Sequence, residues 1–228
     1  ALDVGCGPGD MTVDLAKRGF RTWGIDISDE MIDIARSMTE AAGLDESLVS
    51  LEVGDIEHLD SPDNQFDVVI AAGVVEYLDT DDGWIAEIQR VLKPGGLLIL
   101  NVTNRYAVRR LTAPFFDSLK SFPPFLKLMN SVKNGLLHKG EVHRFPFRPR
   151  THAPGSFDRF LAENGFEKLA HRYFAFSVLP YPFDTMFGFV TIPIRKYLEK
   201  YTAHNMVLTG TGYIVKARNM KSSTENSS

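Results

Sequence analysis

Two periodicities of apolar residues alternate over the first hundred residues of the chain. Short apolar runs bounded by turn residues are typical of buried parallel strands. They predict strands at Ala1–Val4, Arg21–Ile25, Val49–Val53, Phe66–Ala71 and Leu97–Val102. Between them the apolar residues recur at helical spacing. Strands that alternate with helices at this spacing predict right-handed βαβ units, and so an α/β fold with an open parallel sheet.

Capping residues place the helices between these strands. Pro8 stands near the start of a helix that runs to Arg18, and Ser28 is a suitable N-cap for a second helix that stops at Gly43. A third helix is predicted from about Thr80 to Leu92. Lys93-Pro94-Gly95-Gly96 is then expected to form a tight turn into the fifth strand.

The strand–helix rhythm breaks after Val102. Residues 104–150 contain no convincing strand, and Phe125, Leu128 and Met129 recur at helical spacing after Pro123-Pro124. We therefore expect this stretch to be a helical insertion that acts as a lid. A single domain is predicted to span residues 1–218, with the insertion following the fifth strand.

The rest of the chain resumes the earlier rhythm. We expect a helix at about Gly155–Glu163, a strand at about Lys168–Phe176 and a last strand at Tyr213–Arg218. An apolar stretch from Phe183 to Tyr201 has helical spacing, interrupted by Pro193. The polar residues 219–228 are predicted to be a disordered tail.

The most informative motif is Asp3-Val4-Gly5-Cys6-Gly7-Pro8-Gly9, at the carboxyl end of the first strand. Glycines there let a nucleotide-type ligand approach the backbone closely. Asp10 fills the position where a dinucleotide fingerprint needs a small residue, and no Gly-Lys-Ser/Thr of a P-loop follows. The carboxylate of Asp3 favours a cationic ligand over a pyrophosphate.

Acidic residues also follow the second and third strands. Asp26 stands 21 residues after Gly5, where a carboxylate can bind both ribose hydroxyls; the alternative is a role in starting the helix after Ser28. Asp55 can accept a hydrogen bond from an adenine amino group while Ile56 packs on the ring, or it is an ordinary loop residue.

With these motifs the sequence resembles the class I S-adenosylmethionine-dependent methyltransferases, in particular the ubiquinone/menaquinone C-methyltransferase group. The residues Leu2–Gly9, Asp26, Asp55-Ile56, Phe66–Val69 and Arg90–Gly96 follow the order of the family's motifs. The resemblance implies a Rossmann-like, doubly wound, seven-stranded sheet of order 3-2-1-4-5-7-6 with strand 7 antiparallel. It also implies helices before the first strand, and since the chain opens at Ala1 without them, we expect an N-terminal truncation.

The resemblance implies S-adenosyl-L-methionine as the cofactor. The residues that it places around the cofactor are Asp3, Gly5, Cys6, Gly7, Gly9, Asp26, Ile27, Asp55, Ile56, Ala71, Ala72 and Gly73. Asp3 and the glycine loop would then lie at the methionyl part, Asp26 at the ribose, and Asp55 with Ile56 at the adenine. The residues after Gly73 would face the boundary between cofactor and acceptor.

Three residues are candidates for catalysis: His143, Glu76 and Tyr77. A sulfonium is already activated, so an enzyme must chiefly align the acceptor and exclude water. A base is needed only if the acceptor must lose a proton, and His143 or Glu76 is placed for that role. The alternatives are a structural histidine, a capping or salt-bridged Glu76, and a Tyr77 that lines the pocket or fills the core.

Composition narrows the remaining choices. The 228 residues carry a formal net charge of −4 and a pI of about 5.9, which argues against nonspecific nucleic-acid binding. One cysteine excludes a disulfide framework, so we expect a reducing, cytoplasmic location. No apolar run has the length of a membrane span, and no His, Cys, Asp or Glu cluster has metal-ligand spacing.

The aromatic and aliphatic residues of the insertion and of Phe183–Tyr201 predict a small, lipophilic or aromatic acceptor, or simply a helical layer over the sheet. Peripheral membrane contact is a further hypothesis, in which lysines meet anionic headgroups: Lys120, Lys127, Lys133 and Lys139. The competing functions are a non-catalytic S-adenosylmethionine-binding partner or sensor domain and, less favoured, an NAD-dependent oxidoreductase.

Overall fold

A single seven-stranded sheet organises the chain. The structure is a computed structural model, and it describes residues 1–45, 47–119, 149–179, 184, 187–202 and 206–222. The strand order is β3-β2-β1-β4-β5-β7-β6, so the predicted order is confirmed. The strands are β1 (Leu2–Val4), β2 (Thr22–Asp26), β3 (Val49–Val53), β4 (Phe66–Ala71), β5 (Leu92–Thr103), β6 (Phe166–Phe176) and β7 (Gly210–Asn219).

The first five strands are parallel, and their shared register brings their carboxyl ends to one edge of the sheet. Val4 pairs with Ile25 of β2 and with Ala71 of β4, so the loops after these strands start side by side. β7 runs antiparallel to its neighbours. The amide of Met220 donates to the carbonyl of Gly165 at 2.9 Å, which pairs the end of β7 with the start of β6.

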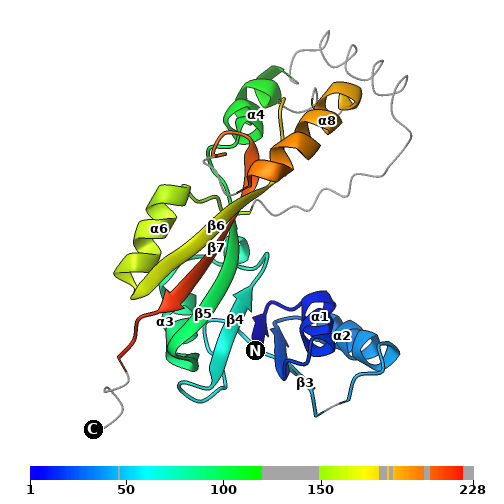
Figure 1. The fold of residues 1–228 in the computed structure, drawn as a ribbon, viewed down its shortest axis with the longest axis vertical. Helices are drawn as coiled ribbons and strands as arrows, with labels where there is room; N and C mark the ends of the chain where they lie inside the picture. The colour runs from blue at the N-terminus through cyan, green and yellow to red at the C-terminus, as the bar shows by residue number, and fades with distance from the viewer. Residues whose placement is uncertain (46, 120–148, 180–183, 185–186, 203–205, 223–228) are drawn as a thin grey trace. The chain divides into compact units, whose positions relative to one another are not determined.

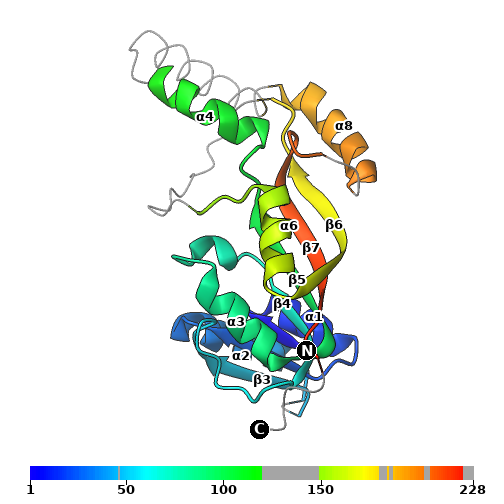
Figure 2. The ribbon, with the colours of Figure 1, turned by 90° about the vertical axis from the view of Figure 1, so that its left-hand side faces the viewer.

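Both sheet faces receive helices, as a doubly wound fold requires. The helices are α1 (Asp10–Lys17), α2 (Asp29–Ala41), α3 (Asp82–Val91), α4 (Val108–Leu119), α6 (Pro154–Glu163) and α8 (Gly188–Leu198), with 3₁₀ turns η1 (Val75–Tyr77) and η2 (Glu199–Tyr201). Helices α1 and α2 lie beside β1–β3, and α3 lies near α6 (Figures 1 and 2). The rings of Trp84 in α3 and Phe160 in α6 are 6.2 Å apart.

The structure differs most from the sequence prediction at the start of β5, and smaller differences occur at other element boundaries, including both ends of β7. The expected tight turn at Lys93–Gly96 is wrong: these residues belong to β5, which starts at Leu92 and shifts register against β4 between Phe66 and Val68. The strand continues past the glycines because an irregularity in the pairing accommodates the extra residues of β5. The last strand also runs on to Asn219, which is fully buried, because the Asn219 amide donates to the carbonyls of Gln89 and Leu92.

The chain divides into two compact units. One contains residues 1–102, 155–171 and 214–228, and the other contains residues 103–154 and 172–213. In the second unit, buried Asn104 donates to the carbonyls of Val207 and Gly210 at 2.6 and 2.7 Å. None of the helices in the described ranges combines the length and the apolarity that a membrane span needs.

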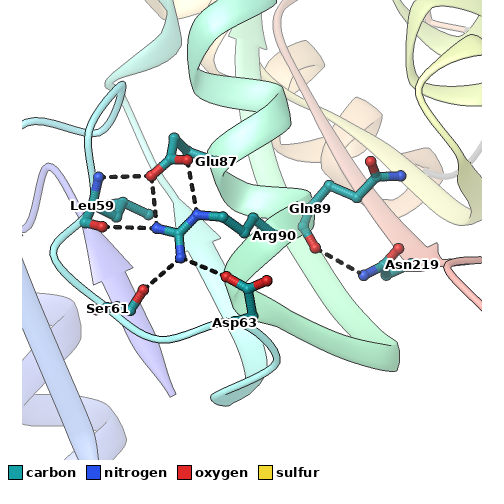
Figure 3. Close-up of polar contacts among 7 residues, drawn as sticks. All are labelled: Leu59, Ser61, Asp63, Glu87, Gln89, Arg90 and Asn219. Atoms are coloured by element: carbon teal, nitrogen blue, oxygen red, sulfur yellow. Dashed lines mark hydrogen bonds and ion pairs between the residues drawn. The ribbon is translucent and has the colours of Figure 1, made fainter. Parts of the chain in front are cut away.

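Arg90 ties the loop between β3 and β4 to helix α3 (Figure 3). Its guanidinium donates to the carbonyls of Leu59 and Ser61 at 2.8 and 2.6 Å, and to the carboxylates of Glu87 and Asp63 at 2.8–2.9 Å. The hydrogen bond with Arg90 lowers the pKa of Glu87, whose carboxylate also accepts from the amide of Leu59. The planar guanidinium thus satisfies four groups from one position.

We predict that Arg90→Met lowers the free energy of unfolding by about 1.5–3 kcal/mol, the range for hydrogen bonds to charged groups. Urea denaturation checks this value. The matched control is Arg18→Met, which removes an exposed pair with Asp14 at the end of helix α1 and should change stability by less than about 0.5 kcal/mol. Equal losses in the two variants would contradict the role given to Arg90.

Candidate functional site

The glycine loop after β1 depends on left-handed backbone at three positions. Gly5, Gly7 and Gly9 have φ of +65°, +52° and +91°. A side chain at Gly5 would overlap Val74, and a Cβ at Gly9 would lie 3.0 Å from the Cβ of Ala35 in α2. At Gly7, by contrast, no atom lies within 4 Å of the position that a Cβ would take. Gly5 and Gly9 are therefore packing positions, whereas Gly7 leaves open space beside the backbone.

Asp26, the last residue of β2, holds the glycine loop in place. One carboxylate oxygen accepts from the amide of Gly7 at 2.8 Å, and the other accepts from the amide of Ser28 at 3.0 Å. Ser28 is itself the N-cap of α2, and its hydroxyl accepts from the amide of Met31 at 3.3 Å. Asp26 therefore supports the helix start that one reading of the sequence assigned to it, and it keeps lone pairs for further donors.

Asp3 places a second carboxylate under the same loop. It is 2% exposed and accepts from the hydroxyl of Thr12 at 2.7 Å. Burial is the main cause that raises the pKa of Asp3 to about 6; the Thr12 hydrogen bonds lower this pKa, and the charge of Asp26 contributes to raising it. The ionised form is thus poorly compensated by the protein, and a cationic ligand beside it would be favoured.

Cys6 lies close enough to both carboxylates for their charges to act on its thiol. Its thiol is buried, and burial together with the charges of Asp3 and Asp26 raises its pKa to about 12. A thiol in this state is protonated and unreactive at neutral pH. Its sulfur would lie 3.2 Å from a Cβ at Gly24, so Cys6 fills the space over the glycine of β2.

The residues after β2 and β3 are arranged differently from one another. Ile27 is 76% exposed, whereas Ile56 is 6% exposed and packs into the core. One oxygen of Asp55 accepts from the amide of Glu57 at 2.9 Å, and the other lies 3.9 Å from His58. The amide of Gly54 donates to the carbonyl of Asp26 at 3.0 Å, which joins the ends of β2 and β3.

The end of β4 carries the next group of predicted residues. Ala71 is fully buried, Ala72 and Gly73 are exposed, and Gly73 has φ of +74°. Glu76 and Tyr77 follow on η1, where Glu76 is 9% exposed and Tyr77 is 57% exposed. These loops start from the same sheet edge as the glycine loop, because β4 pairs with β1.

Three comparisons with known proteins show which proteins the chain resembles. Residues 2–100 match the family model described as methyltransferase domain. The chain is 35% identical over 136 residues to norajmaline N-methyltransferase from Rauvolfia serpentina, covering 59% of this chain and 44% of that protein. It is 32% identical over 172 residues to demethylmenaquinone methyltransferase from Symbiobacterium thermophilum, covering 74% of this chain and 64% of that protein.

Residues 2–100 therefore match the methyltransferase domain family, and the resemblance to the class I S-adenosylmethionine-dependent methyltransferases is confirmed. The fold agrees with a solved methyltransferase from Methanosarcina mazei, with a TM-score of 0.62 at 18% identity, over 97% of this chain and 92% of that chain. S-adenosylmethionine is the cofactor of this class. The chain spans less than two thirds of the length of both curated relatives.

One feature of the methyltransferase domain was missed by sequence reasoning. Asn101 of β5 accepts from the amide of Gly73 at 2.8 Å and so links β5 to the turn after β4. Its signal was present, because it is the only polar residue in the apolar run Leu97–Val102. His143 and the predicted lid helix at Phe125–Met129 lie outside the described residues. A surface hollow of about 650 Å³ on α2, lined by Glu30, Ile34 and Met38, lies away from the glycine loop.

The raised pKa of Asp3 generates a test of the methyltransferase domain. Well below pH 3.8 this group is protonated in both the folded and the unfolded protein; above about pH 6 the folded protein must bury a carboxylate. The folded pKa is raised, so Asp3 reduces stability as pH rises from about 4 to 6, by about 3 kcal/mol in total. We predict that Asp3→Asn stabilises the ligand-free protein at pH 8 but changes it little at pH 4.

The measurement is urea unfolding of both proteins at the two pH values, with the difference between them compared. Asn keeps the oxygen that accepts from Thr12, so the hydrogen bond of the wild type remains in the variant. A variant that is equally stabilised, or equally destabilised, at both pH values would show that the Asp3 carboxylate carries no burial cost.

Proposed function

We propose that this protein transfers the methyl group of S-adenosylmethionine to a small, lipophilic or aromatic acceptor. When bound, S-adenosylmethionine would supply an activated methyl group on a positively charged sulfur, which would leave as a neutral thioether when the acceptor takes the methyl group. An acceptor that carries a proton at the methylated atom releases it. The protein's own contribution is to bind, to align the acceptor and to exclude water.

The observation that carries this proposal is the pair of carboxylates around an open glycine backbone. Asp3 is buried with a carboxylate that the protein compensates poorly, which fits the positive charge of the methionyl part. Asp26 retains acceptor capacity for ribose hydroxyls, and the space beside Gly7 allows close approach to the backbone. These residues therefore fit the cofactor by charge, by hydrogen-bonding capacity and by space.

The remaining assignments extend this proposal along the sheet edge. Gly5, Cys6 and Gly9 shape the loop, Ile27, Asp55 and Ile56 serve the ribose and adenine side, and Ala71, Ala72 and Gly73 serve the sulfonium side. Glu76, Tyr77 and His143 are the candidates to line or deprotonate the acceptor. Burial of Glu76 fits a role at a site from which water is excluded.

The apolar surface of the second unit supports a lipophilic acceptor. On α4, Leu111 and Phe115 are 54% and 65% exposed, and on α8 Phe189 is 77% exposed. Two relatives are named for methylation of small molecules, norajmaline and demethylmenaquinone, which supports an acceptor of this size. We place the reaction in the cytoplasm because the single cysteine fits a reducing compartment.

A matched pair of glycine variants tests cofactor binding. Gly7 and Gly43 both have positive φ, +52° and +65°, and neither has an atom within 4 Å of an added Cβ. Gly7→Ala and Gly43→Ala should each cost about 1–2 kcal/mol of stability from left-handed backbone. Only Gly7→Ala should also weaken S-adenosylmethionine binding, by tenfold or more by calorimetry, because its methyl group enters the space beside the loop.

Unchanged affinity in a folded Gly7→Ala protein would remove the glycine loop from the site. Turnover separates the enzyme from the non-catalytic binding module: the proposal expects S-adenosylhomocysteine to form with a panel of quinol, phenol and amine acceptors. Binding without turnover across the panel would favour the sensor or partner reading. Binding of NAD in place of S-adenosylmethionine would favour an oxidoreductase.

Peripheral membrane contact belongs to the same proposal. The lysines first considered for it, Lys120, Lys127, Lys133 and Lys139, lie outside the described residues, and among the described elements α8 offers a suitable surface. Val190, Ile192 and Tyr197 are 47%, 48% and 57% exposed, and Lys196 and Lys200 are exposed beside them. Apolar side chains with flanking lysines match a bilayer surface that carries anionic headgroups. Such a surface would present a lipophilic acceptor close to the protein.

We predict that Phe189→Ser combined with Ile192→Ser lowers binding to phosphatidylglycerol-containing vesicles at least tenfold in sedimentation assays. Both side chains are exposed, so the melting temperature should change little. The control is Leu111→Ser on α4, which removes an exposed apolar residue from another helix. Wild-type protein that stays in the supernatant with these vesicles would rule the contact out.

A further inference from the structure

The turn after β4 is fixed from two sides. On one side, the amide of Gly73 donates to the side-chain oxygen of Asn101 at 2.8 Å. On the other side, the side chain of Val74 occupies the space where Gly5 lacks a Cβ. Val75 is fully buried and anchors the turn to the core. A continuous set of contacts therefore runs from β5, through this turn, to the start of the glycine loop.

The stability of the sheet alone does not account for a polar residue at position 101 of β5. Its neighbours Leu100 and Val102 are 1% and 0% exposed, whereas Asn101 points to the other, half-buried side of β5. The hydrogen bond with Gly73 is exposed to solvent. An exposed hydrogen bond contributes little to folding, but it does select one position of a turn with left-handed backbone at Gly73.

We infer that Asn101 is a positioning residue for the methionyl end of the cofactor. It holds the Gly73 turn against the glycine loop, so that the backbone of the turn has one fixed place beside the bound ligand. This inference rests on the proposed function, since it concerns the same cofactor. The proposal places the adenosine end at Asp26 and Asp55, which stand at the end of β2 and after β3, so this end should not depend on Asn101.

Two ligands that share the adenosine portion separate the two ends. S-adenosylhomocysteine carries a homocysteine chain, which corresponds to the methionyl part without its methyl group, whereas adenosine lacks this chain. Calorimetry on Asn101→Ala should show S-adenosylhomocysteine binding weakened about three- to tenfold, the effect of one lost hydrogen bond, while adenosine binding is unchanged. Asn101→Asp keeps an oxygen acceptor at the same distance along the side chain and should restore most of the affinity.

Two further variants show that the effect is local. Asn101→Ser is polar but too short to reach Gly73, so it should behave like Asn101→Ala. Asp67→Asn weakens the 2.7 Å contact with Lys93, which joins the same two strands at their opposite ends. Asp67→Asn should leave the affinities for both ligands unchanged. It is the control for a weaker connection between β4 and β5 that does not involve the turn.

The outcomes distinguish this inference from the proposed function. If the wild-type protein binds neither ligand, the proposed function fails and this inference fails with it. If the wild-type protein binds both ligands, and Asn101→Ala weakens them equally or not at all, only this inference is overturned. An Asn101→Asp protein as weak as Asn101→Ala would also overturn it, because the acceptor for the Gly73 amide would then be irrelevant.

Discussion

The carboxylate of Asp26 is the constraint on which the sheet edge depends. It accepts from the amide of Gly7 and from the amide of Ser28, so one side chain fixes both the loop after β1 and the start of α2. Helix α2 then packs on the loop, where Gly9 leaves just enough room for Ala35. A single side chain that accepts from both segments therefore fixes the position of the glycine loop relative to helix α2.

The fold could be read from the sequence because its signals are local. Strands β3 and β4 were predicted with the observed bounds, and Ser28 caps α2 as expected. The start of β5 was not, since Pro94, Gly95 and Gly96 are turn residues by propensity. Pairing with β4 overrides that propensity, and pairing is a long-range property that local patterns do not contain.

In the candidate site, too, some residues could be predicted from local sequence and others could not. Asp3, Asp26 and the glycines are adjacent to strand ends in sequence, so motif and topology together indicate them. Asn101 acts on Gly73 across 28 residues, and no spacing rule connects the two. The raised pKa of Asp3 could not be predicted from the sequence, because it comes from burial rather than from residue type. In the proposed function, the buried carboxylate lowers the stability of the ligand-free protein and raises its affinity for a cation.

The position of β7 has a consequence for how the chain is made. β5 pairs with β4 on one side and with β7 on the other, yet about a hundred residues separate β5 from β7. During synthesis, the edge of β5 that pairs with β7 stays unpaired until β7 has left the ribosome. Asn219 then closes the sheet by donating to the carbonyls of Gln89 and Leu92. Nascent chains that stall before Gly210 would expose that edge, which makes them substrates for chaperones or seeds for aggregation.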